Sequence, residues 1–157
     1  MTPEPLDHLI AVYGAGLDTE VALLGRLSAL SSALDAAATE RDVASVESLT
    51  DERGRVMATL LAVEHELHPT RQQLWERRHE AAPLPAFQAV AATHRRASDL
   101  VGAIMSSDRQ VMEALRTAET ARREAAQDLE VGETTLAAYR RVVAPAVAAA
   151  SLMDRRG

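Results

Sequence analysis

The sequence predicts an all-α fold of three long amphipathic helices, packed as an antiparallel, coiled-coil-like bundle in which the third helix is the longest. Ala, Leu, Arg and Glu dominate the composition, and these residues lose little side-chain freedom in a helix. Aromatic residues make up only 3% of the chain, whereas strands favour aromatic and β-branched side chains. At 157 residues the chain has the length of one domain, so we expect a single helical domain over residues 1–157.

The first helix is expected over about residues 6–39. Gly14 and Gly16 each weaken a helix by about 1 kcal/mol relative to Ala, which predicts a bend or break near residue 15. The apolar stripe stops near Thr39, and Thr39 or Asp42 can cap a following helix. Its stripe consists of Val21, Leu24, Leu27, Ser31, Leu34 and Ala38.

The second helix is expected over about residues 43–80. Pro69 lacks a backbone N–H and clashes with the preceding turn, which predicts a kink near residue 69. Pro83 and Pro85 then separate this helix from the third one. The stripe of the second helix contains Val43, Val46, Leu49, Val56, Met57, Leu60, Val63 and Leu67.

The third helix is expected over about residues 85–144, a length of roughly 90 Å at 1.5 Å per residue. Alternating steps of four and three define a heptad seam on it. The seam consists of Ile104, Asp108, Val111, Leu115, Ala118, Arg122, Ala125, Leu129, Gly132, Leu136, Tyr139 and Val143. Its small residues bury little apolar area, so we expect the second half of the helix to need a partner. Pro145 is expected to end the helix, leaving a flexible tail over residues 145–157.

Composition and charge argue against several classes of protein. The net charge of −6 and the lack of a dense basic run disfavour binding to nucleic acid. The chain has no Cys, which excludes disulfides and thiolate metal sites. No apolar run approaches the roughly 20 residues of a membrane span, and the acidic, proline-broken start is unlike a signal peptide. We therefore expect a cytoplasmic protein that does not insert into membranes.

Pairs of possible metal ligands occur twice, but neither pair completes a site. Glu64 and His68 share a helix face at a spacing of four residues, and two ligands are too few for a closed metal site. Glu76 and His79 form one Glu-x-x-His pair, whereas a di-iron bundle needs two. We predict no catalytic residue, no metal and no cofactor, and hence no enzyme.

His94 offers one alternative to this view. It precedes Arg95 and Arg96, whose cations could steady a phosphoryl group. A histidine-phosphotransfer bundle therefore stays open as the least favoured hypothesis.

Three features occur within about residues 17–80: a long Leu-rich first helix, a turn and helix start at residues 40–49, and a Leu- and Glu-rich segment at residues 60–67. In these features the region resembles the FlgN-type flagellar export chaperone family. The resemblance implies a cytoplasmic chaperone that binds amphipathic helices of hook–filament junction proteins and delivers them to the type III export gate.

The family's cargo contacts lie in its C-terminal helical region. This carries over to Leu129, Leu136 and Val143, and the same seam adds Val111 and Leu115. Tyr139 becomes the candidate for docking to the export gate, although its seam position is also typical of bundle packing. A structural coiled coil, in which the third helix pairs with its own copy in a homodimer, is the alternative.

Overall fold

The structure, a computed structural model, is all-helical, with 92% of residues in helices and no strand among the residues described. It describes the backbone of residues 2–154 and the side chains of residues 2–141. The predicted all-α class with long helices is therefore confirmed. The elements are α1 (Leu6–Thr39), α2 (Val43–Glu76), the short α3 (Arg78–Ala81) and α4 (Pro85–Asp154).

The chain divides into two compact units, Met1–Ala114 and Leu115–Gly157. The first unit contains α1, α2, α3 and the beginning of α4, whereas the second contains the remainder of α4. The expectation of a single domain stays a prediction.

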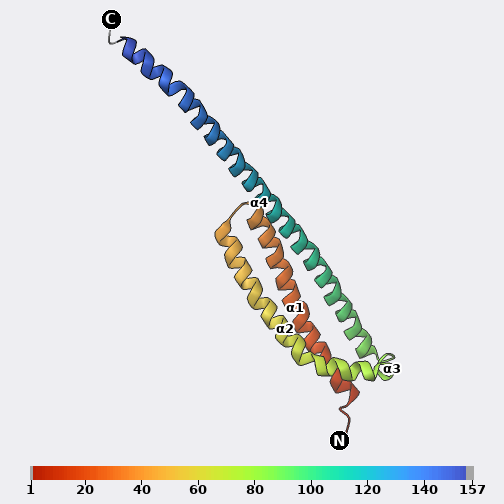
Figure 1. Ribbon diagram of the computed structural model, residues 1–157. Coiled ribbons are helices and arrows are strands. Elements are labelled where there is room, and N and C mark those ends of the chain that lie inside the picture. The colour runs from red at the N-terminus through yellow and green to blue at the C-terminus, as the bar shows by residue number, and fades with distance from the viewer. Residues whose placement is uncertain (1, 155–157) are drawn as a thin grey trace. The chain divides into compact units, whose positions relative to one another are not determined.

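The core of the first unit is built mainly on α1. Figure 1 shows α1 and α2 side by side, with the beginning of α4 alongside them. Leu17 and Leu27 are each only 1% exposed, so the stripe of α1 is covered from more than one side. One cluster of buried residues holds Leu9, Ile10, Tyr13, Leu17, Leu67, Leu74 and Ala81, and the other holds Leu24, Leu27, Leu30, Val56, Ala97 and Ile104.

Among the described helices, α1 is long and apolar enough to cross a membrane by length and composition alone. Core helices commonly have this composition as well. The apolar residues of α1 pack in both core clusters, and a carboxylate, Glu20, is buried on the same helix. α1 therefore has the packing of a core helix over the residues of the two clusters.

The glycines of α1 permit close packing and do not interrupt the helix. α1 runs through Gly14 and Gly16 without a break, so a break near residue 15 is wrong, and the bend predicted there stays a prediction. A Cβ atom on Gly16 would lie 2.2 Å from Leu67 Cδ2, and one on Gly14 would lie 3.1 Å from Val90 Cγ2. The absence of a side chain at Gly16 therefore allows Leu67 to approach the backbone of α1.

Replacing Gly16 by Ala is expected to destabilise the chain despite the better helix propensity of Ala. Overpacking a core costs about 1–3 kcal/mol, against a gain of about 1 kcal/mol in propensity. Leu67 is buried, so moving its side chain away from a Cβ atom would disturb the core around it. The matched control is Gly25→Ala, because nothing lies within 4 Å of a Cβ there. Urea unfolding should show Gly25→Ala to be stabilised and Gly16→Ala destabilised, and equal stabilisation of both would contradict the packing role.

Asp42, one of the two predicted capping residues, caps α2. Its Oδ1 accepts a hydrogen bond from the Ser45 backbone N–H at 3.1 Å, and its Oδ2 accepts one from the Ser45 hydroxyl at 2.6 Å. These two hydrogen bonds lower the pKa of Asp42. Thr39 instead donates its hydroxyl to the Asp35 carbonyl. Arg41 takes a positive φ of 58° in the turn, which closes the connection between α1 and α2.

α2 ends at Glu76, four residues before the predicted end, although it continues through Pro69. In Figure 1 the ribbon of α2 changes direction in its last turns, where it approaches α3. Arg77 leaves the helical conformation, with φ −102° and ψ 20°. Its guanidinium donates to the Glu4 carbonyl at 2.9 Å and pairs with Glu80 at 3.0 Å. These contacts hold the turn that separates α2 from α3.

α4 continues through Pro145 and ends at Asp154, so the predicted helix end at Ala144 is wrong. A proline in a helix removes one hydrogen bond, and the surrounding alanines favour the helix strongly enough to continue it. Residues 155–157 of the predicted tail lie outside the described residues.

A polar contact fixes the register of α1, α2 and the beginning of α4. The hydroxyl of Ser31 on α1, which is 1% exposed, donates to Asp108 Oδ1 on α4 at 3.0 Å. Arg53 on α2 pairs with the other carboxylate oxygen of Asp108. Shifting α1, α2 or α4 along its axis would leave the buried Ser31 or the partly buried Arg53 and Asp108 without a partner.

Candidate functional site

The seam predicted on α4 is exposed over most of its second half. Leu129, Leu136 and Tyr139 are 73%, 68% and 66% exposed, whereas Leu115 is 45% exposed. Val143 lies outside the residues whose side chains are described. The structure therefore leaves three of the five predicted cargo contacts and the predicted docking tyrosine accessible to a partner.

The prediction that Val111 contacts cargo is wrong. This residue is only 9% exposed, so it is not accessible to cargo as predicted. Val111 is the last buried residue of α4 among those described. The heptad pattern continues across this boundary without a change, which explains why the sequence alone placed Val111 and Leu115 in one binding surface.

Within residues 115–141, every side chain is exposed. Local contacts support the helix here, including the Glu119–Arg123 pair at 2.8 Å and the Thr120 hydroxyl bonded to the Arg116 carbonyl. Val131 is also 66% exposed, although it lies off the seam. We call Leu129, Leu136 and Tyr139, together with the small residues Ala118, Ala125 and Gly132 on the same face, the α4 seam.

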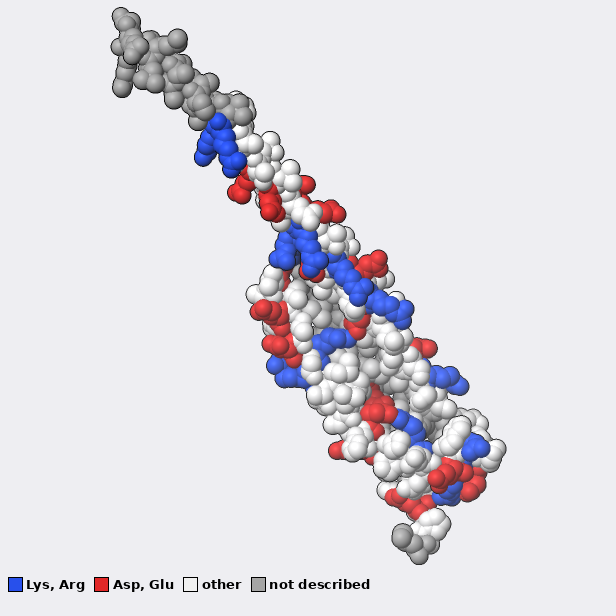
Figure 2. Space-filling view, viewed as in Figure 1, with Lys and Arg blue, Asp and Glu red and all other residues white. Residues whose placement is uncertain are grey.

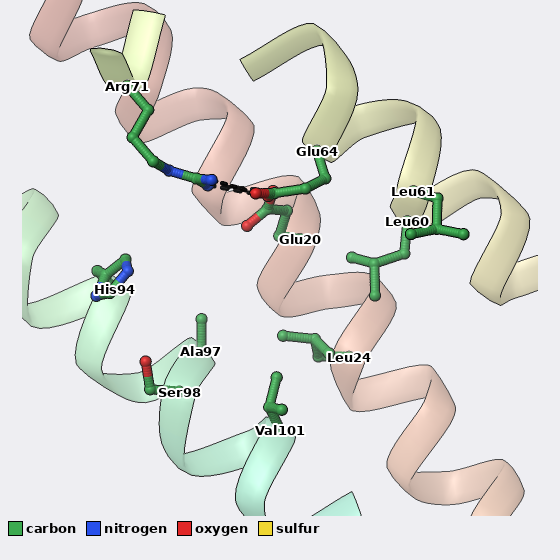
Figure 3. A pocket seen from close by; sticks show the side chains of 10 residues that line it. All are labelled: Glu20, Leu24, Leu60, Leu61, Glu64, Arg71, His94, Ala97, Ser98 and Val101. Atoms are coloured by element: carbon green, nitrogen blue, oxygen red, sulfur yellow. Dashed lines mark hydrogen bonds and ion pairs between the residues drawn. The ribbon is translucent and has the colours of Figure 1, made fainter. Parts of the chain in front are cut away.

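A cleft of about 470 Å³ lies in the first unit, lined by α1, α2 and α4 (Figure 3). We call it the Glu20 cleft. The side chains of Glu20, Glu64 and Arg71 gather in it, and His94 comes from α4. Its apolar lining consists of Leu24, Leu60, Leu61, Ala97 and Val101.

Arg71 holds the polar cluster together. Both of its terminal nitrogens pair with the Glu64 carboxylate, one of them at 2.9 Å. Its Nε donates to the Tyr13 hydroxyl at 3.2 Å, and the guanidinium lies 5.6 Å from the centre of the Tyr13 ring. A paired, two-point contact of this kind fixes both position and orientation.

Glu20 is the least solvated carboxyl of the cluster, with an exposed fraction of 6%. Its Oε1 lies 3.9 Å from Arg71 Nη2 and has no hydrogen-bond partner in the described structure. Burial, together with a hydrogen bond to the Glu64 carboxyl, raises the pKa of Glu20 to about 7. Hydrogen bonds from Arg71 and Glu20 keep the pKa of Glu64 well below its ordinary value. The pair therefore retains a proton on Glu20 up to near-neutral pH.

The residues described contain no group of three or more His, Cys, Asp or Glu side chains that could hold a metal ion. The Glu64 carboxylate, considered above with His68 as a possible pair of metal ligands, is instead occupied by Arg71. His94 is exposed and lines the Glu20 cleft, and its role as a phosphoacceptor stays a hypothesis.

The sequence carries a signal for this cluster, because two charged residues stand on the apolar stripes of α1 and α2. Glu20 stands on the apolar stripe of α1, three residues after Leu17 and four before Leu24. Arg71 stands in the same way between Leu67 and Leu74 on α2. A charged residue at a core-facing position needs a partner, so these two positions were candidates for an ion pair.

A scan against protein-family models, a search of curated proteins and a search of solved structures each find no match.

Proposed function

We propose that this chain binds an amphipathic helix of a partner protein along the α4 seam. The exposure of Leu129, Leu136 and Tyr139 at heptad spacing is the observation that carries the proposal. In this account, α1, α2 and the beginning of α4 form an antiparallel, coiled-coil-like bundle that anchors α4. The α4 seam then supplies one half of a helix pair.

The small residues of the seam indicate what kind of helix fits. Ala118, Ala125 and Gly132 leave shallow positions between the larger side chains, and a partner's Leu, Ile or Phe can fill them as a knob fills a hole. Burying one Leu contributes about 1.5–3 kcal/mol, and association itself costs several kcal/mol. Two leucines are therefore insufficient, and the partner must supply bulky apolar residues over several turns.

Charge plays a smaller part in this recognition. Figure 2 shows Arg and acidic side chains interspersed along the helices on the face in view. Mixed charges of this kind provide no single-sign field that would select a partner from a distance. Apolar contact along the seam is therefore the main source of affinity in this proposal.

The resemblance to FlgN-type chaperones suggests the identity of the partner. We propose that the chain is a non-catalytic cytoplasmic chaperone for hook–filament junction proteins, which it keeps unassembled and passes to the type III export gate. Tyr139 is then the docking residue for the gate. Its exposed ring and hydroxyl suit a contact surface that is apolar at its centre and polar at its edge.

Truncating the chain after Gln127 should abolish binding of the purified hook–filament junction protein from the same genome. The shortened chain keeps both core clusters and loses Leu129, Leu136 and Tyr139. Truncation after Arg141 is the matched control, because it keeps all three residues and should keep binding. Calorimetry measures binding, and circular dichroism checks that both forms are folded. Full binding by the Gln127 truncation would exclude the α4 seam as the binding surface.

A structural homodimer is the second candidate, because the same exposed seam could pair with its own copy. In a chaperone a client helix covers Leu129 and Leu136, whereas in a homodimer a second copy of the chain covers them. The two candidates therefore differ in the molar mass of the isolated chain. A permanent dimer through α4 leaves no free seam for a client helix.

A further inference from the structure

A second cleft, of about 590 Å³, lies next to the Glu20 cleft in the first unit, and the two share Arg71 and His94. We call it the Trp75 cleft. Four of its lining residues form an apolar floor. Tyr13 and Leu74 are buried, and Phe87 and Val90 are partly buried. Trp75 is 66% exposed beside it. The cleft thus combines an apolar floor with an accessible aromatic ring.

Aromatic residues are concentrated at this one place. The chain has only four of them, and Tyr13, Trp75 and Phe87 all line the Trp75 cleft. Tyr13 and Phe87 also pack in the core, whereas Trp75 is largely exposed. Ligand sites characteristically combine aromatic walls with a few polar groups that fix orientation.

The charge of the cleft is opposite to that of the whole chain. Arg78, His79, His94 and Arg95 stand around it, and no carboxylate is among its described lining residues, although the net charge of the chain is −6. Arg71 also lines the cleft, but its guanidinium is occupied by Glu64 and Tyr13.

Two of these arginines are available to a ligand. Arg78 lies over the Trp75 ring at 4.7 Å and donates to the Trp75 carbonyl at 2.9 Å, which holds its guanidinium beside the aromatic surface. Neither Arg78 nor Arg95 forms an ion pair with a carboxylate in the part of the chain that the structure describes. Two guanidinium groups without carboxylate partners, beside an apolar floor, favour an anion that carries an apolar group.

We propose that the Trp75 cleft binds a small amphipathic carboxylate, a molecule with an aromatic or short acyl part and one carboxylate group. The apolar part packs on Phe87, Val90 and Trp75, and the carboxylate accepts hydrogen bonds from Arg95 and Arg78. The cleft volume lies within the range of roughly 300–1,000 Å³ that is usual for small-molecule sites. Every lining residue precedes the α4 seam, so this site is independent of the proposed helix binding.

The test uses Trp75 as its reporter, because it is the only Trp in the chain. The full-length chain is titrated with 4-phenylbutyrate, and saturable quenching or shift of the Trp75 fluorescence is expected. Its amine and alcohol counterparts, 4-phenylbutylamine and 4-phenylbutanol, and inorganic phosphate alone should bind at least about tenfold more weakly, since each lacks either the anion or the apolar part.

Arg95→Gln should weaken binding of 4-phenylbutyrate by about tenfold, the usual effect of losing one charge-assisted hydrogen bond. Arg96→Gln is the matched control, because Arg96 is the adjacent exposed arginine and does not line the cleft. Neither side chain has an ion pair in the structure as described, so both variants should fold. Equal loss in both variants would show only a general charge effect and would overturn the proposal. Equal binding of the amine, or no saturable change in Trp75 fluorescence, would overturn it as well.

Discussion

Replacing Glu20 by Gln is expected to stabilise the chain at about pH 8 and to remove most of the pH dependence of its stability above about pH 5. Glu20 has a pKa of about 7 in the folded chain and 4.5 as its ordinary value. The folded state therefore binds the Glu20 proton more tightly than the unfolded state does. The resulting stability is fully present below pH 4.5 and is lost as the pH rises through 7.

The size of this stability change follows from the difference between the two pKa values of Glu20. Each pKa unit corresponds to 1.36 kcal/mol, so the wild-type chain should lose up to about 3 kcal/mol of stability between about pH 5 and pH 8. Glu64 contributes to stability in a different pH range. Because its pKa is lowered, its contribution is present above its ordinary value and is lost only as the pH falls below that value. The two carboxyls can therefore be separated by pH.

Urea unfolding at about pH 5 and at about pH 8 measures this change in stability. Gln has the shape of a neutral Glu and can still donate a hydrogen bond to Glu64, so the E20Q variant should keep the packing of the core. Glu47→Gln is the matched control, because Glu47 is exposed, and it should behave as the wild type does. A wild-type chain equally stable at both pH values would show that Glu20 is not held protonated by its surroundings.

Replacing Leu129 and Leu136 together by Asp is expected to weaken binding of the partner helix by more than about a hundredfold. Both residues are largely exposed in the isolated chain, so the change should leave the core intact. In the complex each would place a carboxylate in an apolar interface, where a charge without a partner is strongly unfavourable.

Val131→Asp is the matched control for this variant. Val131 is similarly exposed, but two residues along a helix rotate a side chain by about 200°, away from Leu129. The Val131→Asp variant introduces the same kind of charge into the same turns of α4 and should leave binding nearly unchanged. Titration calorimetry against the hook–filament junction protein measures all three chains. Equal weakening by Val131→Asp would indicate a general loss of helix stability instead of a contact on the seam.

The parts of this fold that could be predicted from the sequence are those determined locally. The extent of α1 follows from its Leu-rich stripe, and the start of α2 follows from the capping chemistry of Asp42. The role of Gly16 could not be predicted in this way. It depends on Leu67, a residue on another helix that lies directly opposite. Without that contact, a glycine in a helix indicates only weakness.

The candidate sites likewise combine features that depend on local sequence with features that depend on tertiary packing. The exposed seam around Leu129 and Leu136 was visible as a heptad pattern filled with small residues. Its beginning was misplaced at Val111, because the periodicity is the same for covered and uncovered turns. The Glu20–Arg71 cluster required knowledge of the register between α1 and α2, which the sequence pattern does not contain. The concentration of Tyr13, Trp75 and Phe87 in one cleft likewise depends on tertiary packing.

We propose that the α4 seam is free in the isolated chain and is covered by a helix of another protein in the complex. Sedimentation equilibrium over a wide range of concentration, with and without the hook–filament junction protein, tests it most directly. The isolated chain should have the monomer mass of 16.9 kDa, and the two proteins should form a complex when they are mixed. A dimer of the isolated chain at every concentration, converted to monomer by replacing Leu129 and Leu136 with Asp, would contradict it.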